Sequence, residues 1–373
     1  MSKTESLHCR HLDRQGLTIT TVDRQRHREF HLTLLPLPWE KPAEIVRRLA
    51  LALKDREASV VRHEVFGAVA AQPEIISALK REFGRFDWPV MWIEGQPCIG
   101  QLISGMHIFA VAETKVDTLD LDGLPIARIY NDGYMCHCLL GDVKPLNLSA
   151  STTEQSRELF ERLERALSNA GMSLTDVVRT WFFLDDILDW YGIFNLARND
   201  FYRSKNLFQN LMPASTGVGG RNPSSAAVVA GAWAVKKISN QLRVCEVLSP
   251  LQNSPVEYGS AFSRAVLMAA PDSRRLLLSG TASIGQSGQS VHQGNVREQI
   301  ALTMEVVRQI LYSNGFNYSN VTRATAYFKD SGGASVFKAW REEQNIEAVP
   351  LLVTQADICR DELLFEVELD AVH

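Results

Sequence analysis

Residues 166–184 read ALSNAGMSLTDVVRTWFFL, and residues 310–328 read ILYSNGFNYSNVTRATAYF. The two segments align without a gap. The aligned pairs are Gly171 with Gly315, Val177 with Val321, Arg179 with Arg323 and Phe183 with Tyr327. An internal repeat at this distance indicates that one structural unit occurs at least twice in the chain.

Each copy shows the same order of expected elements: an amphipathic helix, a glycine that ends it, an apolar strand, a second helix and a final apolar strand. In the first copy these helices and strands are expected at 155–170, 177–184, 190–202 and 226–235. In the second copy they are expected at 296–314, 321–328, 334–344 and 363–369. A pair of strands precedes the first helix of each copy, at 125–130 and 134–140 and again at 261–269 and 275–284.

The unit is therefore β-β-α-β-α-β, with the helices on one face of a mixed sheet, which is an α+β fold. One copy spans residues 115–245 and the other spans 246–373. Residues 1–114 repeat the order of elements but match poorly in sequence, so a third, degenerate copy and an unrelated covering region both remain open. With a third copy, the chain would form a pseudo-trimer by itself. Such a chain has less need to oligomerise, so we expect a monomer.

The composition excludes several classes of function. The net charge is −4 and there is no Lys/Arg block, so nucleic acid is not an expected partner. The longest apolar run, 226–235, is too short to span a bilayer, and the N-terminus has no apolar signal segment, so we expect a cytoplasmic protein. Cys136 and Cys138 would share one strand face while His137 points to the other, so no metal site is expected.

Two stretches, GNVREQIALTMEVVRQILYSNGFNYSNVTRATAYF at 294–328 and LLFEVELDAV at 363–372, resemble the Rid (reactive intermediate deaminase) family. The resemblance implies the same unit, also called chorismate-mutase-like, and ligand pockets at the boundaries between units. Rid deaminases carry Pro-Ala-Arg before the last strand, where the arginine holds the substrate carboxylate. This chain has Pro213-Ala214-Ser215 and Pro350-Leu351-Leu352 instead, which argues against imine hydrolysis.

A second resemblance, to the chorismatase family, covers most of the chain after residue 110. It implies a cofactor-free reaction on chorismate, a small dianionic metabolite. The segments that carry it are DWYGIFNLARNDFY (189–202), MPASTGVGGRNP (212–223), SPLQNSPVEYGSAFSRA (249–265), LLLSGTASI (276–284) and DICRDELLFEVELDA (357–371).

The final strand places two glutamates on one face. Phe365, Val367 and Leu369 alternate with Glu366 and Glu368, so the carboxyls face away from the apolar core. A solvated sheet face is one reading of this pattern. The resemblance favours another, because chorismatases place their catalytic glutamate at the position that matches Glu366. Burial and a neighbouring like charge would keep such a carboxyl protonated near neutral pH, as an acid that protonates an enol ether requires.

A dianion also needs cationic groups or aligned N–H groups. Arg264, Arg198 and Arg323 are candidate substrate ligands, with surface or interdomain ion pairs as the alternative for each. Arg179, the repeat equivalent of Arg323, is a further candidate with the same alternative. The glycine-rich stretch 215–220 is read as a loop, either a plain tight turn or a carboxylate-binding backbone. The remaining candidate substrate-binding residues are Tyr191, Tyr258, Thr216, Gly217 and Gly219.

Cys359 lies seven residues before Glu366 and could be a small buried residue. In chorismatases the matching position separates product types, and a cysteine there accompanies 3-hydroxybenzoate formation. The resemblance therefore implies conversion of chorismate to 3-hydroxybenzoate and pyruvate, with Glu366 as the proton donor and Cys359 shaping the pocket. The alternatives are hydrolysis to a dihydroxycyclohexadiene acid, a mixture with 4-hydroxybenzoate, and a non-catalytic small-molecule-binding protein.

Overall fold

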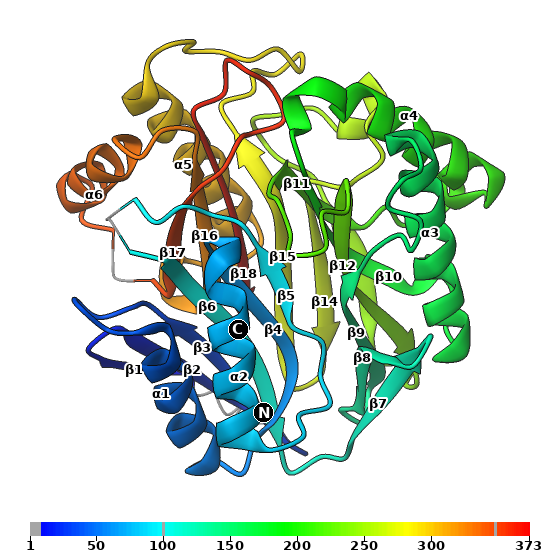
Figure 1. The fold of residues 1–373 in the computed structure, drawn as a ribbon. Helices are drawn as coiled ribbons and strands as arrows, with labels where there is room; N and C mark the ends of the chain where they lie inside the picture. Colours follow the sequence, from blue (N-terminus) through cyan, green and yellow to red (C-terminus); the bar gives the residue numbers. More distant parts are fainter. Residues whose placement is uncertain (1–8, 99–100, 347–348) are drawn as a thin grey trace, which may run out of the picture.

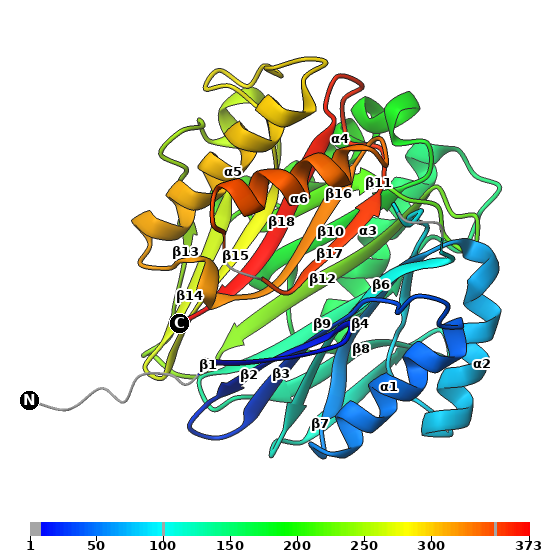
Figure 2. The same ribbon diagram turned by 90° about the vertical axis from the view of Figure 1, so that its left-hand side faces the viewer.

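Three six-stranded sheets lie around the centre of the molecule, and pairs of helices cover them on the outside (Figure 1 and Figure 2). The structure is a computed structural model that describes residues 9–98, 101–346 and 349–373, with the backbone only for Cys9, Arg10, Glu257 and Tyr258. In the described part of the chain, no helix has both the length and the apolar character needed to cross a bilayer.

The three sheets follow one another along the chain and define a first, a middle and a third unit. The first unit contains β1 (Cys9–Arg14), β2 (Leu17–Asp23), β3 (Arg28–Leu34), α1 (Pro42–Lys54), β4 (Ser59–Gly67), α2 (Gln72–Phe83), β5 (Met91–Ile93) and β6 (Ile103–Ala112). The middle unit contains β7 (Val116–Leu121), β8 (Leu124–Asn131), β9 (Met135–Val143), α3 (Thr152–Asn169), β10 (Val177–Leu184), α4 (Ile187–Ser204), β11 (Ala214–Gly219) and β12 (Val228–Lys237). The third unit contains β13 (Arg243–Val247), β14 (Ala265–Ala270), β15 (Ser273–Ala282), α5 (Val296–Ser313), β16 (Val321–Phe328), α6 (Gly333–Glu343), β17 (Leu351–Gln355) and β18 (Phe365–Val372).

All three sheets share one topology. In the first sheet the strand order is β1-β2-β3-β6-β4-β5, and the other two repeat it. One pair in each sheet is parallel (β4 with β5, β10 with β11, β16 with β17), and the remaining pairs are antiparallel. The α+β fold of Rid-like units is thus confirmed, and the N-terminal region, here the first unit, is a further copy of the same fold. The middle and third units each have two more strands than the sequence pattern predicted: one more leading strand, β7 or β13, and one between the second helix and the last strand, β11 or β17.

Register irregularities mark equivalent residues in the three units. The ladder shifts between Val60 and Arg62, between Val177 and Arg179, and between Val321 and Arg323. The three arginines are therefore structural equivalents, as are Phe66, Phe183 and Tyr327 four residues later. Phe66 contacts both of the other two rings, with centroids 6.1 and 6.2 Å apart. These contacts lie where a pseudo-threefold axis relates the units.

Helix ends follow the expected chemistry of glycine. Gly171 and Gly315, directly after the C-caps of α3 and α5, have φ of 69° and 76°. Behind them, the amide of Met172 donates to the Leu167 carbonyl and that of Phe316 to the Leu311 carbonyl, both at 2.9 Å. This pattern closes a helix with a left-handed glycine.

Apolar cores lie in two kinds of place. Each helix pair packs on its own sheet, and a further buried cluster joins all three units, with Val61 and Phe109 from the first, Trp181 and Trp233 from the middle, and Leu277 and Leu352 from the third. Full burial of such a side chain contributes about 1.5–3 kcal/mol. The central cluster therefore makes the three units one folded body.

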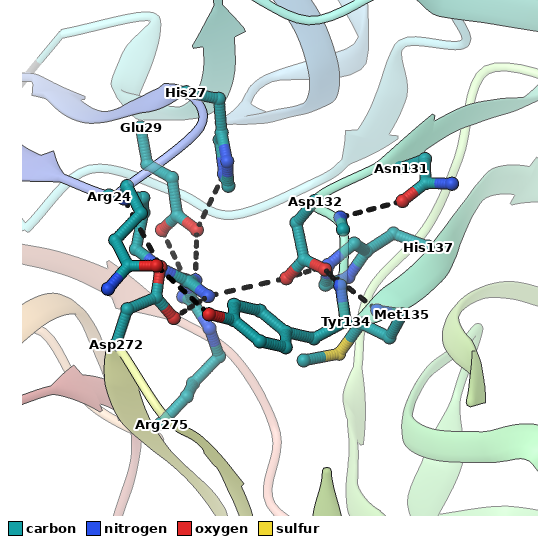
Figure 3. Close-up of polar contacts among 12 residues, drawn as sticks. Arg24, His27, Glu29, Asn131, Asp132, Tyr134, Met135, His137, Asp272 and Arg275 are labelled. Carbon is teal, nitrogen blue, oxygen red and sulfur yellow. Dashed lines mark hydrogen bonds and ion pairs between the residues drawn. The ribbon is translucent and has the colours of Figure 1, made fainter. Parts of the chain in front are cut away.

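A buried ionic cluster also joins the units (Figure 3). Arg24 of the first unit donates to Glu29 at 3.0 Å, to Asp132 of the middle unit at 3.3 Å and to Asp272 of the third at 2.8 Å. Arg275 pairs with the second oxygen of Glu29. Nearby His137 contacts Asp132 and lies on the strand face opposite to the core residue Cys138, as the alternation predicted.

The sheets meet edge to face in a cycle. Strand β11 lies against β15, β17 against β6, and β5 against β9, which gives a middle–third, a third–first and a first–middle interface. The prediction of a loop at 215–220 was wrong, because Ala214–Gly219 forms β11, paired in parallel with β10. This small, glycine-rich strand allows close packing at the middle–third interface.

Candidate active site

Strand β18 presents alternate residues to two environments. Phe365, Val367 and Leu369 pack under the helices of the third unit. Glu366 and Glu368 point the other way, towards the middle–third interface, and both are buried. The predicted alternation is confirmed, whereas the reading of a solvated sheet face is wrong.

Glu368 is fully enclosed by donors. One carboxylate oxygen accepts from Arg179, from Thr216 at 2.5 Å and from the Trp181 indole at 2.8 Å. The other accepts from Arg323 and, at 3.3 Å, from Tyr327. Burial alone would raise the pKa of Glu368, but the arginines and the Thr216 hydrogen bond hold that pKa at about 2. Glu368 is therefore a carboxylate at neutral pH.

Glu366 lies two residues away and has the opposite protonation state. Only 5% of it is exposed, and no described residue forms a hydrogen bond to its carboxyl. Burial, reinforced by the negative charge of Glu368, raises the pKa of Glu366 to about 8, although Arg179 acts in the opposite sense. A carboxyl with this pKa is mostly protonated at pH 7 and can act as a general acid.

Gly280 leaves the space that the Glu366 carboxyl occupies. A Cβ on Gly280 would lie 2.0 Å from Glu366 Oε1 and 3.2 Å from the methyl group of Thr216. The Gly280 amide donates to Thr216 Oγ1 at 3.0 Å, so one hydroxyl bridges this strand and Glu368. Sequence reasoning did not single out Gly280. Its signal was a glycine inside the strand expected at 275–284, because a glycine within a strand often marks a bulge or a close approach.

Tyr191 and Cys359 lie near the same carboxyl. Burial raises the pKa of the Cys359 thiol to about 12, and the charge of Glu366 adds to this shift. Burial also raises the pKa of Tyr191, with smaller contributions from Cys359 and Glu366 and an opposing one from Arg198. At neutral pH the thiol and the phenol are both uncharged. The strand β11 residue Gly217 lies against the Tyr191 ring, where a Cβ would be 3.2 Å from the hydroxyl oxygen.

Comparison with known proteins gives the family. The model for the family described as endoribonuclease L-PSP matches residues 141–231 and 256–373, more than half of the chain. The chain belongs to the endoribonuclease L-PSP family. The Rid resemblance is thereby confirmed over the middle and third units. Among curated proteins, no sequence matches this chain.

One solved structure resembles the fold of most of the chain, and others match a single part of it. A chorismatase crystal structure covers 84% of this chain and 93% of its own, with 15% identity and a TM-score of 0.60. A putative endoribonuclease L-PSP from Entamoeba histolytica covers 35% of this chain and 100% of its own, at 20% identity and TM-score 0.30. TdcF from E. coli, solved with bound serine, covers 29% of this chain and 86% of its own, at 21% identity and TM-score 0.26.

The arginines that were predicted as substrate ligands have different surroundings in the structure. Arg198 on α4 is 2% exposed, and its guanidinium donates to Asn195 at 2.7 Å. Arg264 is also buried and donates to the Asn253 carbonyl at 3.3 Å. Arg323 instead pairs with Glu368, Glu64 and Asp370. Its contacts are those of an ion-pair network, and its role in substrate binding stays a prediction.

The remaining predicted residues fall into two groups. Thr216 and Gly217 lie beside Glu366 and Tyr191, as described above. The Gly219 amide donates to the Asp357 carbonyl at 2.7 Å, and a Cβ on Gly219 would lie 3.0 Å from Asp357 Cβ, so this glycine serves a close strand approach and its N–H is already used. The side chain of Tyr258 lies outside the described residues. Ser215, at the position of the Rid arginine, accepts a hydrogen bond from Thr180 at 2.9 Å.

Proposed function

We propose that this protein is a chorismatase that converts chorismate to 3-hydroxybenzoate and pyruvate without a cofactor. The observation that carries the proposal is the opposite charge state of two carboxyls two residues apart, with a pKa of about 8 for Glu366 and about 2 for Glu368. Neighbouring groups whose pKa values are driven apart are a signature of acid and base assignments in active sites.

The chemistry requires one proton in the right place. Glu366 donates its proton to the terminal methylene carbon of the enol ether, which becomes the methyl group of pyruvate. The bond between ring carbon C3 and the ether oxygen then breaks, with its electrons going to the oxygen that leaves with pyruvate, while the neighbouring C4 hydroxyl oxygen bonds to C3 and releases its proton, which gives an epoxide. The C4–O bond of the epoxide then opens as its oxygen takes up a proton, and C3 loses its hydrogen as a proton, which leaves an aromatic ring with the hydroxyl at C3. Two protons are taken up and two are released in these steps, so Glu366 can be restored. The two products together contain all the atoms of chorismate, so no oxidant or water is consumed.

The surroundings of Glu366 support this role. Tyr191 and Cys359 are uncharged and lie beside the carboxyl, and Arg198 and Arg264 are buried cations that suit the two carboxylates of the substrate. Cys359 is buried near Glu366, and we propose that it limits the space beside the substrate ring. We therefore propose the aromatic product over the dihydroxycyclohexadiene acid.

The test is direct. Purified protein is mixed with chorismate, pyruvate is measured enzymatically, and the ring products are separated by chromatography. Equal amounts of pyruvate and 3-hydroxybenzoate are expected. A diene acid or 4-hydroxybenzoate would correct the product, and pyruvate at the uncatalysed rate would overturn the proposal. A shift in melting temperature with chorismate but without turnover would identify a binding protein.

A further inference from the structure

We propose that the first unit controls the protonation of Glu366 through Arg62 and Glu64 on β4, which complete the charge balance of the buried network around Glu368. The proposal deepens the proposed function, because it assigns positioning residues to the same site. It also answers what the N-terminal unit contributes to a site built by the other two.

The side chains of β4 reach both partner units. The Arg62 guanidinium lies 2.5 Å from Glu64 and 3.7 Å from Asp370 of β18. It stacks on Trp181 of β10, with its central carbon 3.5 Å from the ring centroid. Trp181 in turn donates to Glu368. Arg62 is thus one side chain away from the carboxylate that neighbours Glu366.

Glu64 reaches the same carboxylate through an arginine. Its second oxygen lies 3.2 Å from Arg323 Nη2, and the same nitrogen pairs with Glu368. Burial raises the pKa of Tyr327, which is directly opposite Glu366 in the ladder, and the charges of Glu64 and Glu366 add to this shift. The first unit therefore acts on the network from two directions.

The network is balanced without Glu366. Three buried guanidinium groups, those of Arg62, Arg179 and Arg323, face three buried carboxylates, those of Glu64, Glu368 and Asp370. Among the described residues, the other titratable groups that face it are His31 on β3, His107 on β6 and Tyr327 on β16, and all three are uncharged at neutral pH because burial lowers the pKa of both histidines and raises the pKa of the tyrosine. On the far side of Glu366, Tyr191 and Cys359 are uncharged as well.

A fourth carboxylate would add an uncompensated buried charge, which is costly, so Glu366 keeps its proton. Removal of one member of the β4 pair breaks this balance in a defined direction. Glu64→Gln leaves an excess positive charge, and ionised Glu366 would compensate it. Arg62→Met leaves an excess negative charge, which opposes ionisation further.

The experiment compares Glu64→Gln, Arg62→Met, the double variant and Arg62→Lys in the full chain. The readouts are the pH profile of pyruvate release and the infrared band of the protonated Glu366 carboxyl, identified by its loss in Glu366→Gln. For Glu64→Gln both midpoints are expected to fall by about one pH unit, and for Arg62→Met to rise by about one. The double variant restores the balance and is expected to return to the wild-type midpoint, as is Arg62→Lys, which keeps the charge.

The matched control is the exposed pair Arg28–Glu113 in the same unit, changed to Met and Gln. No shift is expected there. Midpoints within 0.2 pH unit of wild type in both buried single variants, or a double variant that keeps the shift of either single one, would overturn the inference. If a single variant does not fold, the other single variant still gives the direction of the midpoint shift. The double variant still shows whether the midpoint returns to the wild-type value. Because the infrared band needs no turnover, a protein inactive on chorismate still tests the inference separately from the proposed function.

Discussion

The middle–third and first–middle interfaces are built from equivalent strands but contain different chemistry. In the third unit Glu366 is paired with Tyr327, and in the middle unit Val229 is paired with the equivalent Phe183. Across the interface, Thr216 of β11 is replaced by its equivalent Met91 of β5. The Met91 methyl group lies 3.2 Å from the position of a Cβ on Gly231, so this side chain fills the space at the first–middle interface.

The third–first interface is also closed. Gly105 stands where Glu366 stands in the third unit, and a Cβ on it would lie 2.9 Å from Leu352. The fold thus provides three equivalent edges, and two of them are packed with apolar side chains. The middle–third interface differs because β18 places two carboxyls there. The residues of the opposite strand, β11, are small enough to leave room for them.

The largest expected effect comes from the acid itself. Glu366→Gln keeps the shape of the side chain but removes the transferable proton, so kcat for pyruvate release is expected to fall about 10²- to 10⁴-fold. Steady-state kinetics and a melting curve measure this. Val229→Ala at the equivalent position of the first–middle interface is the control, and it is expected to keep the activity per folded molecule. Full activity in Glu366→Gln would remove the residue from the mechanism.

Packing of the closed interface is expected to matter for stability alone. Met91→Ala should lower the free energy of unfolding by about 2–5 kcal/mol, because it empties a buried space that the rest of the core fills only in part. Urea unfolding followed by tryptophan fluorescence gives this value. Activity per folded molecule should stay near that of wild type. A large loss of kcat with unchanged stability would mean that the first–middle interface takes part in the reaction.

A methyl group added at Gly280 would occupy the space of the Glu366 carboxyl at the middle–third interface. Gly280→Ala would place a Cβ 2.0 Å from Glu366 Oε1, so the carboxyl must move, and kcat is expected to fall at least about tenfold. Gly141→Ala, at the matching bulge of the middle unit, meets Pro89 at 3.2 Å and is expected to leave kcat unchanged. Equal effects of the two changes would indicate general disturbance of the strands.

The smallest effect is a dependence on pH. The protonated form of Glu366 is the active one and its pKa is about 8, so kcat is expected to be level at lower pH and to fall tenfold per unit above it. An initial-rate series in constant ionic strength checks this. A rate that rises through pH 8 would show that a base, and not this acid, limits the reaction.

Much of the fold and the strand position of Glu366 could be predicted from the periodicity of the sequence, because the repeat has strong physical signals. Helix-ending glycines and the alternation of β18 identified two units and the strand face that carries Glu366. The first unit has weaker sequence signals, although the tripeptide Val60-Val61-Arg62 is identical to Val177-Val178-Arg179 and occupies the same place in its unit. That short match was the available signal for the β4 arginine.

The site's long-range partners could not be predicted in the same way. Strand β11 was read as a loop because glycine and small polar residues have low strand propensity, and its pairing with β10 overrides that preference. Arg179 and Arg323 were predicted as substrate ligands from their charge, and their pairing with Glu368 was not predicted. Pairings between residues of different units depend on how the sheets assemble, which no local pattern encodes.

The proposed reaction depends on a neutral Glu366 beside a charged Glu368, two residues away on β18. Carbon-13 NMR of protein labelled at the glutamate side-chain carboxyl carbon, assigned with Glu366→Gln and Glu368→Gln, measures both in the resting protein. We expect a midpoint near pH 8 for Glu366 and no titration of Glu368 from pH 5 to pH 9. A Glu366 midpoint close to the ordinary glutamate value of 4.5 would contradict it.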